Sequence, residues 1–199
     1  MMVYRGIEVT YESIREWCQK FGQHYANQLR RKRPYITDKW HLDEVMVSIK
    51  GQQYYLWRAV DSEGNVLDVL LQQQRDTDAA KRFFRKLLKK QGFVPQVIVT
   101  DKLKSYEAAK KQVMKQVEHR QLKGLNNRVE NSHQPTRVRE QRMRKFKSPG
   151  QAQRFLSAFG PIREHFHPKQ HELTAPRYRE QLRHLFQDWR EVAGLNSAT

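Results

Sequence analysis

The chain has 199 residues, with 38 Lys and Arg against 21 Asp and Glu, which gives a net charge of +17. This length is sufficient for one domain of ordinary size with its own hydrophobic core. The single cysteine excludes an internal disulfide and a cysteine-based zinc site. No apolar run is long enough to span a membrane, and the amino terminus lacks a signal-peptide stretch, so we expect a cytoplasmic protein. The charge favours a polyanionic partner, the alternative being a merely basic cytosolic protein.

The amino-terminal segment predicts one amphipathic helix. Thr10 is a suitable N-cap, apolar side chains recur at helical spacing over residues 11–21, and Gly22 is placed to end the helix. Residues 23–38 then predict a basic linker, whose run of Arg and Lys is either a solvated segment or a DNA contact.

The middle of the chain predicts an antiparallel meander followed by a crossover. Alternating apolar residues indicate strands over 43–49, 54–60 and 66–71. A helix with a continuous apolar stripe begins at Thr77 or Asp76 and ends at Gly92. The apolar run 97–99 is typical of a short buried parallel strand.

The remaining elements are helical apart from one strand. A polar helix is expected over 105–115, a last strand over 117–122, and amphipathic helices around 152–159 and 178–189. The order of strands and helices predicts a mixed sheet flanked by helices, which is the α/β class.

Three carboxylates stand apart from the other acidic residues. Asp43 lies within the first strand, Asp101 directly follows the buried strand, and Glu130 lies at a candidate helix start. Each alone could have a structural role, as a salt-bridged strand residue, a strand-end cap or a helix-start acid. Asp61, by contrast, is predicted to be a turn residue.

If the three carboxylates converge, they call for a counter-charge, because carboxylates held side by side repel one another. Mg²⁺ prefers oxygen ligands, so two or three carboxylates are enough to hold it. Two such ions can promote the cleavage and joining of phosphodiesters, and a basic surface would hold the nucleic acid against them.

Several ordered motifs together resemble a known family, the DDE-type insertion-sequence transposases of the IS-six family. The resemblance covers nearly the whole chain from Gly6 to Phe166. The matching segments are residues 40–45 (WHLDEV), 55–61 (YLWRAVD), 99–102 (VTDK), 118–121 (EHRQ), 126–133 (NNRVENSH), 144–148 (RKFKS) and 152–156 (AQRFL).

The resemblance implies a ribonuclease-H-like, retroviral-integrase-like fold in which Asp43, Asp101 and Glu130 are the catalytic carboxylates. They would hold two Mg²⁺ or Mn²⁺ ions for cutting donor ends and for strand transfer into target DNA, with a cointegrate as the expected product. The implied partners are the transposon ends, the target DNA and further copies of the chain in a synaptic complex. A prokaryotic, nucleoid-associated protein with no membrane contact is therefore expected.

The family comparison also predicts how the chain is organised. Residues 1–22 match only the second half of a helix-turn-helix, which suggests a shortened copy. Residues 23–38 are the basic linker, residues 39–166 the ribonuclease-H-like catalytic domain, and residues 167–199 a C-terminal helical extension.

Basic residues near the carboxylates are candidates for DNA contact. Lys102 follows Asp101 directly, and His133 lies three residues after Glu130, where a helix would place both on one face. A dense basic stretch beyond them favours contact with the DNA backbone over a solvated face. Its members are Arg137, Arg139, Arg142, Arg144, Lys145 and Lys147.

Two other functions remain open from the sequence. One is a truncated DNA-binding remnant without transposition activity, because end recognition would need the missing helix. The other is a metal-dependent nuclease of the same fold, which would hydrolyse DNA without joining it.

Overall fold

We analysed a computed structural model of the chain, which describes residues 8–32, 36–121, 134, 138, 146–167 and 173–195. The chain divides into two compact units, and each is considered by itself. One is Pro34–Leu156, and the other combines Met1–Arg33 with Ser157–Thr199. The second unit thus joins segments from both ends of the chain.

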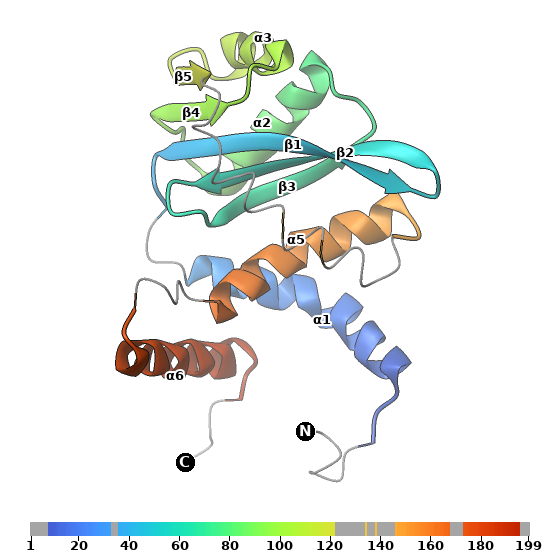
Figure 1. The fold of residues 1–199 in the computed structure, drawn as a ribbon, viewed down its shortest axis with the longest axis vertical. Coiled ribbons are helices and arrows are strands. Elements are labelled where there is room, and N and C mark those ends of the chain that lie inside the picture. Colours follow the sequence, from blue (N-terminus) through green and yellow to red (C-terminus); the bar gives the residue numbers. More distant parts are fainter. Residues whose placement is uncertain are drawn as a thin grey trace. The chain divides into compact units, whose positions relative to one another are not determined.

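The first unit is built on a five-stranded sheet with the order β3-β2-β1-β4-β5 (Figure 1). The first three strands pair antiparallel, whereas β4 lies parallel to β1 and β5 parallel to β4. This arrangement confirms the predicted mixed sheet. The strands are β1 (Lys39–Ile49), β2 (Gln52–Asp61), β3 (Val66–Gln72), β4 (Val97–Thr100) and β5 (Glu118–Gln121).

The turn between β2 and β3 is organised by one buried carboxylate. Oδ1 of Asp61 accepts hydrogen bonds from the backbone N–H groups of Glu63 and Asn65, each at 2.9 Å. Asp61 is therefore the turn residue that the sequence predicted, with its charge satisfied locally.

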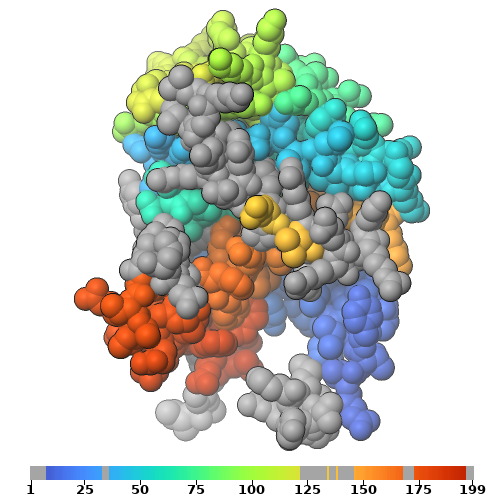
Figure 2. Space-filling model, viewed as in Figure 1, coloured from blue at the N-terminus to red at the C-terminus, as the bar shows by residue number. Residues whose placement is uncertain are grey.

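Helices α2 (Thr77–Gln91) and α3 (Lys104–Val113) cover one face of the sheet (Figure 1). Asp76 caps α2 by accepting from the N–H of Ala79 at 2.7 Å, and Gly92 ends the helix at a φ of 77°. The core beneath these helices includes the fully buried side chains of Trp40, Trp57, Phe83, Phe84 and Tyr106. The outer surface of α3 is yellow-green in Figure 2.

The opposite face of the sheet is covered by the beginning of α5 (Pro149–Phe166). Val47 and Val69 from the sheet form a second core with Phe146 and Leu156. Burial on both faces keeps water from most of β1, so a charged side chain on this strand needs a partner or an ion.

The second unit contains α1 (Tyr11–Arg31) and α6 (Ala175–Val192). Thr10 caps α1 as predicted, accepting from the N–H of Ser13 at 3.1 Å. The expected helix end at Gly22 is wrong, because α1 continues through it for nine further residues, up to Arg31. A glycine inside a helix costs only about 1 kcal/mol, and burial of Ala26 and Leu29 stabilises the continuation.

Part of the predicted basic linker is therefore helical. The ring of Tyr25 packs edge-on against Trp189 of α6 with centroids 5.3 Å apart, and Lys32 lies 3.1 Å from Asp188. Within the described ranges, none of the helices is both long and apolar enough to cross a membrane.

Candidate metal centre

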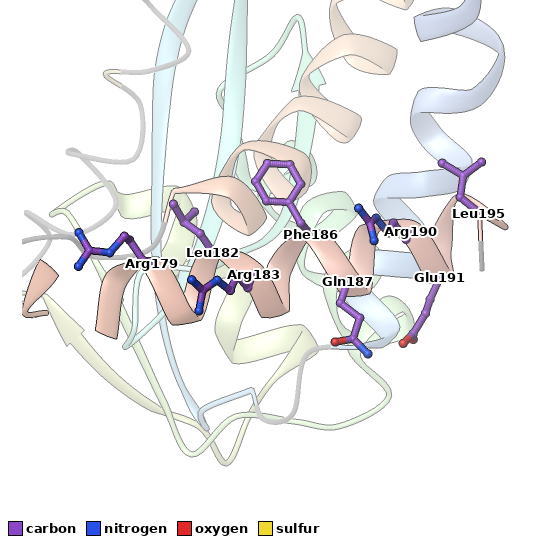
Figure 3. Close-up of a pocket in the computed structure, with 8 residues that line it drawn as sticks. All are labelled: Arg179, Leu182, Arg183, Phe186, Gln187, Arg190, Glu191 and Leu195. Carbon is purple, nitrogen blue, oxygen red and sulfur yellow. The ribbon is translucent and has the colours of Figure 1, made fainter. Parts of the chain in front are cut away.

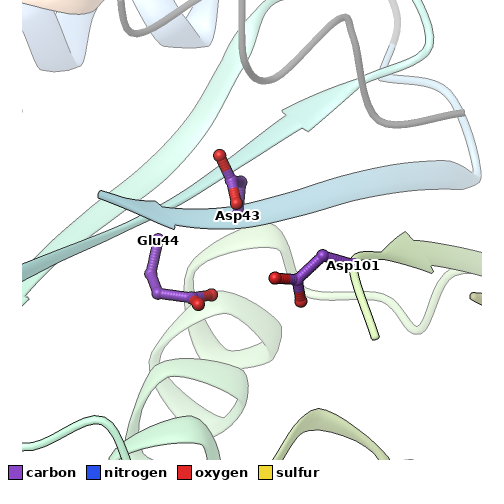
Figure 4. A group of neighbouring side chains, drawn as sticks. All are labelled: Asp43, Glu44 and Asp101. Carbon is purple, nitrogen blue, oxygen red and sulfur yellow. The ribbon is translucent and has the colours of Figure 1, made fainter. Parts of the chain in front are cut away.

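The candidate site begins with two adjacent acidic residues on β1. Trp40 and Leu42 of this strand contribute to the core under α2 and α3, whereas Val47 and Ile49 contribute to the core under α5. Successive side chains of a strand alternate between faces, so Glu44 belongs to the α2–α3 side and Asp43 to the α5 side. Figure 4 shows the two side chains projecting from opposite faces of β1.

Asp101 comes to the site from the neighbouring strand. The parallel register pairs His41 of β1 with Val99 of β4, so Asp101, the residue directly after β4, lies beside Asp43. Oδ1 of Asp101 accepts from the N–H of Leu103 at 3.0 Å, just before α3 begins. This bond fixes the carboxylate at the carboxyl end of β4, where open α/β sheets place their sites.

The three carboxylates form one cluster. Asp43, Glu44 and Asp101 each offer an oxygen, and these oxygens lie within 4.8 Å of one another (Figure 4). Asp43 and Asp101 are half-buried, whereas the side chain of Glu44 is fully buried. An all-oxygen, anionic donor set at the edge of a sheet fits a hard divalent cation such as Mg²⁺ or Mn²⁺.

Arg75 supplies positive charge from the segment before α2. Its Nε donates to Oε1 of Glu44 at 2.7 Å, and its Nη2 reaches the same oxygen and lies 3.7 Å from Oδ2 of Asp101. One guanidinium therefore spans two of the three carboxylates. Oε2 of Glu44 and the hydroxyl of Tyr106 are both buried without a hydrogen bond of ordinary geometry in the described part of the chain.

Burial controls the protonation of Glu44. Loss of hydration raises the pKa of Glu44 to about 7, and the nearby charge of Asp101 adds to the rise. The Tyr106 hydroxyl and Arg75 oppose it. Burial, followed by the charge of Glu44, also raises the pKa of Tyr106 well above its ordinary value. The buried surroundings of Glu44 and Tyr106 thus disfavour extra negative charge.

Only part of the predicted site lies within the described residues. Oxygens of Asp43 and Asp101 lie within 4.8 Å of each other, and Lys102 and Lys147 are exposed. The other predicted positions fall outside the described residues, so the structure neither brings them to the site nor separates them from it. These are Glu130, His133, Arg137, Arg139, Arg142, Arg144 and Lys145.

Two members of the site were not singled out from the sequence, namely Glu44 and Arg75. A signal for Glu44 was present, because it lies two residues after Leu42 in the strand and therefore on the same, buried face. Arg75 lies in a connection between a strand and a helix, where no periodic pattern indicates which way a side chain turns.

A second concave surface lies along α6 and carries none of the predicted site residues (Figure 3). Its lining combines basic, apolar and other polar side chains from one face of α6 with Leu195, which follows the helix. The residues are Arg179, Leu182, Arg183, Phe186, Gln187, Arg190, Glu191 and Leu195.

Comparisons with known proteins show the family of the chain. Residues 37–169 match a family model described as a DDE domain. The chain is 34% identical over 143 residues to the transposase for insertion sequence-like element IS431mec of Staphylococcus aureus, covering 69% of this chain and 63% of the relative. The same figures hold for the transposase for insertion sequence element IS257 in transposon Tn4003 of Staphylococcus aureus.

Two solved structures are also similar to this chain. The catalytic domain of Mos1 mariner transposase gives a TM-score of 0.48 at 9% identity, covering 94% of this chain and 95% of that one. The HTLV-2 integrase catalytic core domain, solved in complex with magnesium, gives a TM-score of 0.46 at 16% identity, covering 56% and 75%.

The matched residues define a DDE domain that covers most of the chain. The chain belongs to the DDE-domain family of insertion-sequence transposases, in the IS-six group that its motifs resemble. It spans 63% of the length of the Staphylococcus aureus relatives.

Proposed function

We propose that this chain is a transposase that cuts DNA at the ends of its element and joins them to target DNA. The observation that carries the proposal is the meeting of Asp43 and Asp101, which come from different strands to within 4.8 Å in a DDE domain. Two aspartates at the carboxyl end of a parallel strand pair are placed where a scissile phosphate can approach from solvent.

Asp43, Asp101 and Glu130 are the residues we assign to the cation site. These residues would hold two Mg²⁺ or Mn²⁺ ions, which would activate a water or a DNA 3′-hydroxyl and would stabilise the leaving oxygen of a phosphodiester. Asp101 is held in place by the N–H of Leu103, so that its carboxylate is already oriented before substrate arrives. The chain itself need not supply a general base.

Basic residues around the site would bind the DNA backbone. Lys102 is exposed next to Asp101 and is suited to contact a phosphate near the cut. We assign the same role to Lys147, His133 and the basic stretch that precedes α5, whose members are Arg137, Arg139, Arg142, Arg144 and Lys145. Joining two ends to one target calls for more than one copy of the chain and yields a cointegrate, at the nucleoid of a prokaryotic cell.

The test is a product analysis with labelled duplexes taken from the inverted repeats that flank the coding sequence. The protein is incubated with these duplexes, target DNA and Mg²⁺, and Glu130→Gln serves as the inactive variant. A joined product that disappears in Glu130→Gln supports the proposal. Cutting without joining would instead show a nuclease, and salt-sensitive binding with neither product would show a DNA-binding remnant.

A further inference from the structure

Arg75 is the one cation that the described residues place against both Glu44 and Asp101. Its guanidinium contacts Oε1 of Glu44 through Nε and Nη2, and the same Nη2 lies 3.7 Å from Oδ2 of Asp101. The Arg75 side chain is 42% exposed, whereas that of Glu44 is fully buried. Arg75 therefore closes the solvent side of Glu44.

We propose that Arg75 is a positioning residue that keeps Glu44 out of the coordination sphere of the bound cation. Within the described cluster, the ion is then left to Asp43 and Asp101. This inference rests on the proposed function, because it concerns how the same cluster selects its ligands.

The contacts of the Glu44 carboxylate support its exclusion from the coordination sphere of the cation. Oε1 is already occupied by two donors from Arg75, and Oε2 faces the buried interior near Tyr106. One oxygen of Glu44 already lies within 4.8 Å of oxygens of Asp43 and Asp101. An ion that took Oε1 as a ligand would have to displace the Arg75 contacts. A buried ion pair that loses one member is strongly disfavoured, so the pair stays closed while Arg75 is present.

The shape of the guanidinium explains why the residue is an arginine. A planar fork with several fixed donors can contact two carboxylates at once, whereas a lysine ammonium acts as a point charge. Arg75→Lys keeps the charge without the fork. We therefore expect it to behave more like Arg75→Gln than like the native protein in cation binding.

The test is a double-mutant cycle on Mn²⁺ affinity, measured by calorimetry and by the Mn²⁺ electron paramagnetic resonance spectrum, above neutral pH and without DNA. Glu44→Gln alone should leave the affinity within about twofold, because Glu44 is not a ligand. Arg75→Gln should tighten binding about tenfold, since a nearby positive charge is lost and Glu44 is released toward the ion. The double variant should return to within about threefold of the native affinity.

Controls separate this inference from the site assignment. Asp43→Asn should abolish the tight Mn²⁺ binding, and if it does not, the proposed cation site itself is wrong. Arg85→Gln removes an exposed charge from α2 and should leave the affinity unchanged. If Arg75→Gln does not fold, Arg75→Lys and the double variant, which leaves no buried charge, complete the comparison.

Two results would overturn the inference while the site stands. In one, Glu44→Gln in the native background weakens Mn²⁺ binding as much as Asp43→Asn does, which would make Glu44 a direct ligand. In the other, Glu44→Gln has the same effect with and without Arg75, which would mean that the two residues are uncoupled.

Discussion

Asp43 and Glu44 are neighbours in the chain but project from opposite faces of β1, and Asp101 lies within 4.8 Å of both carboxylates. The two neighbours therefore experience different surroundings. Asp43 is half-buried, whereas Glu44 is enclosed with Arg75 and Tyr106. One strand thus provides both the carboxylate that we assign to the cation site and a buried carboxyl group whose charge must be compensated.

Glu44 should make the metal-free protein less stable as the pH rises. Its pKa is raised from 4.5 to about 7 in the folded chain, so the folded state holds a proton that the unfolded state has lost. The contribution of Glu44 to the free energy of unfolding is complete below about pH 4.5 and is lost as the pH rises to about 7. The free energy of unfolding should fall by about 3 kcal/mol over this range. Urea unfolding in EDTA should therefore show that Glu44→Gln gains stability relative to the native protein across this window.

Glu107→Gln is the matched control on α3. Lys111 lowers the pKa of Glu107, so Glu107 is ionised above pH 4.5. Its contribution to the free energy of unfolding should therefore stay constant above that pH. The assignment of the buried charge to Glu44 would be contradicted if both variants followed the native protein in parallel from about pH 4.5 to 7.

Two lysines should together compensate the buried charge of Asp68. Its buried carboxylate lies 2.6 Å from Lys86 and 2.5 Å from Lys90, both on α2. Replacing both lysines by Met leaves an uncompensated buried charge and should cost about 3–5 kcal/mol in urea unfolding. Each single replacement should cost less than half of this, because the other lysine remains.

Lys81→Met tests the same change at an exposed pair. Lys81 lies 3.0 Å from Asp78, whose side chain is 72% exposed, so its loss should cost less than about 1 kcal/mol. Two results together would rule out the joint compensation of Asp68. Lys86→Met, Lys90→Met and Lys81→Met would have equal effects, and replacing Lys86 and Lys90 together would cost no more than the sum of the two single replacements.

Lys102 should contribute to DNA affinity through a phosphate. Lys102→Ala is expected to weaken binding similarly for different sequences and to reduce the slope of log affinity against log salt by about 0.9. Fluorescence anisotropy over a salt series measures this slope. Lys50→Ala, in the exposed turn after β1, is the control, and an equal change there would show that Lys102 acts only through net charge.

The sequence indicated the fold well because its signals were local. The capping residue Asp76 and the left-handed Gly92 mark the ends of α2, and alternation marks the strands. The helix end at Gly22 was wrong because a local breaker signal was outweighed by burial of Ala26 and Leu29. Tertiary packing can override a single glycine in this way.

The candidate site was only partly accessible from the sequence. Asp43 could be found because a carboxylate among apolar strand residues needs compensation, and Asp101 because the end of a buried parallel strand is a recurrent place for chemistry. Arg75, which contacts Glu44 and Asp101, could not be found, since it lies 31 residues from Glu44 in a connection whose direction depends on the packing of α2.

The most direct test of the account is the rate of Mg²⁺-dependent strand joining by Asp43→Asn beside the native chain. Asp78→Asn, an exposed carboxylate on α2, is the charge-matched control. We predict that Asp43→Asn loses at least about a hundredfold in rate while its fold is kept, and that Asp78→Asn stays within about twofold. Joining by Asp43→Asn at the native rate would contradict the assignment of the cation site to the carboxylate cluster.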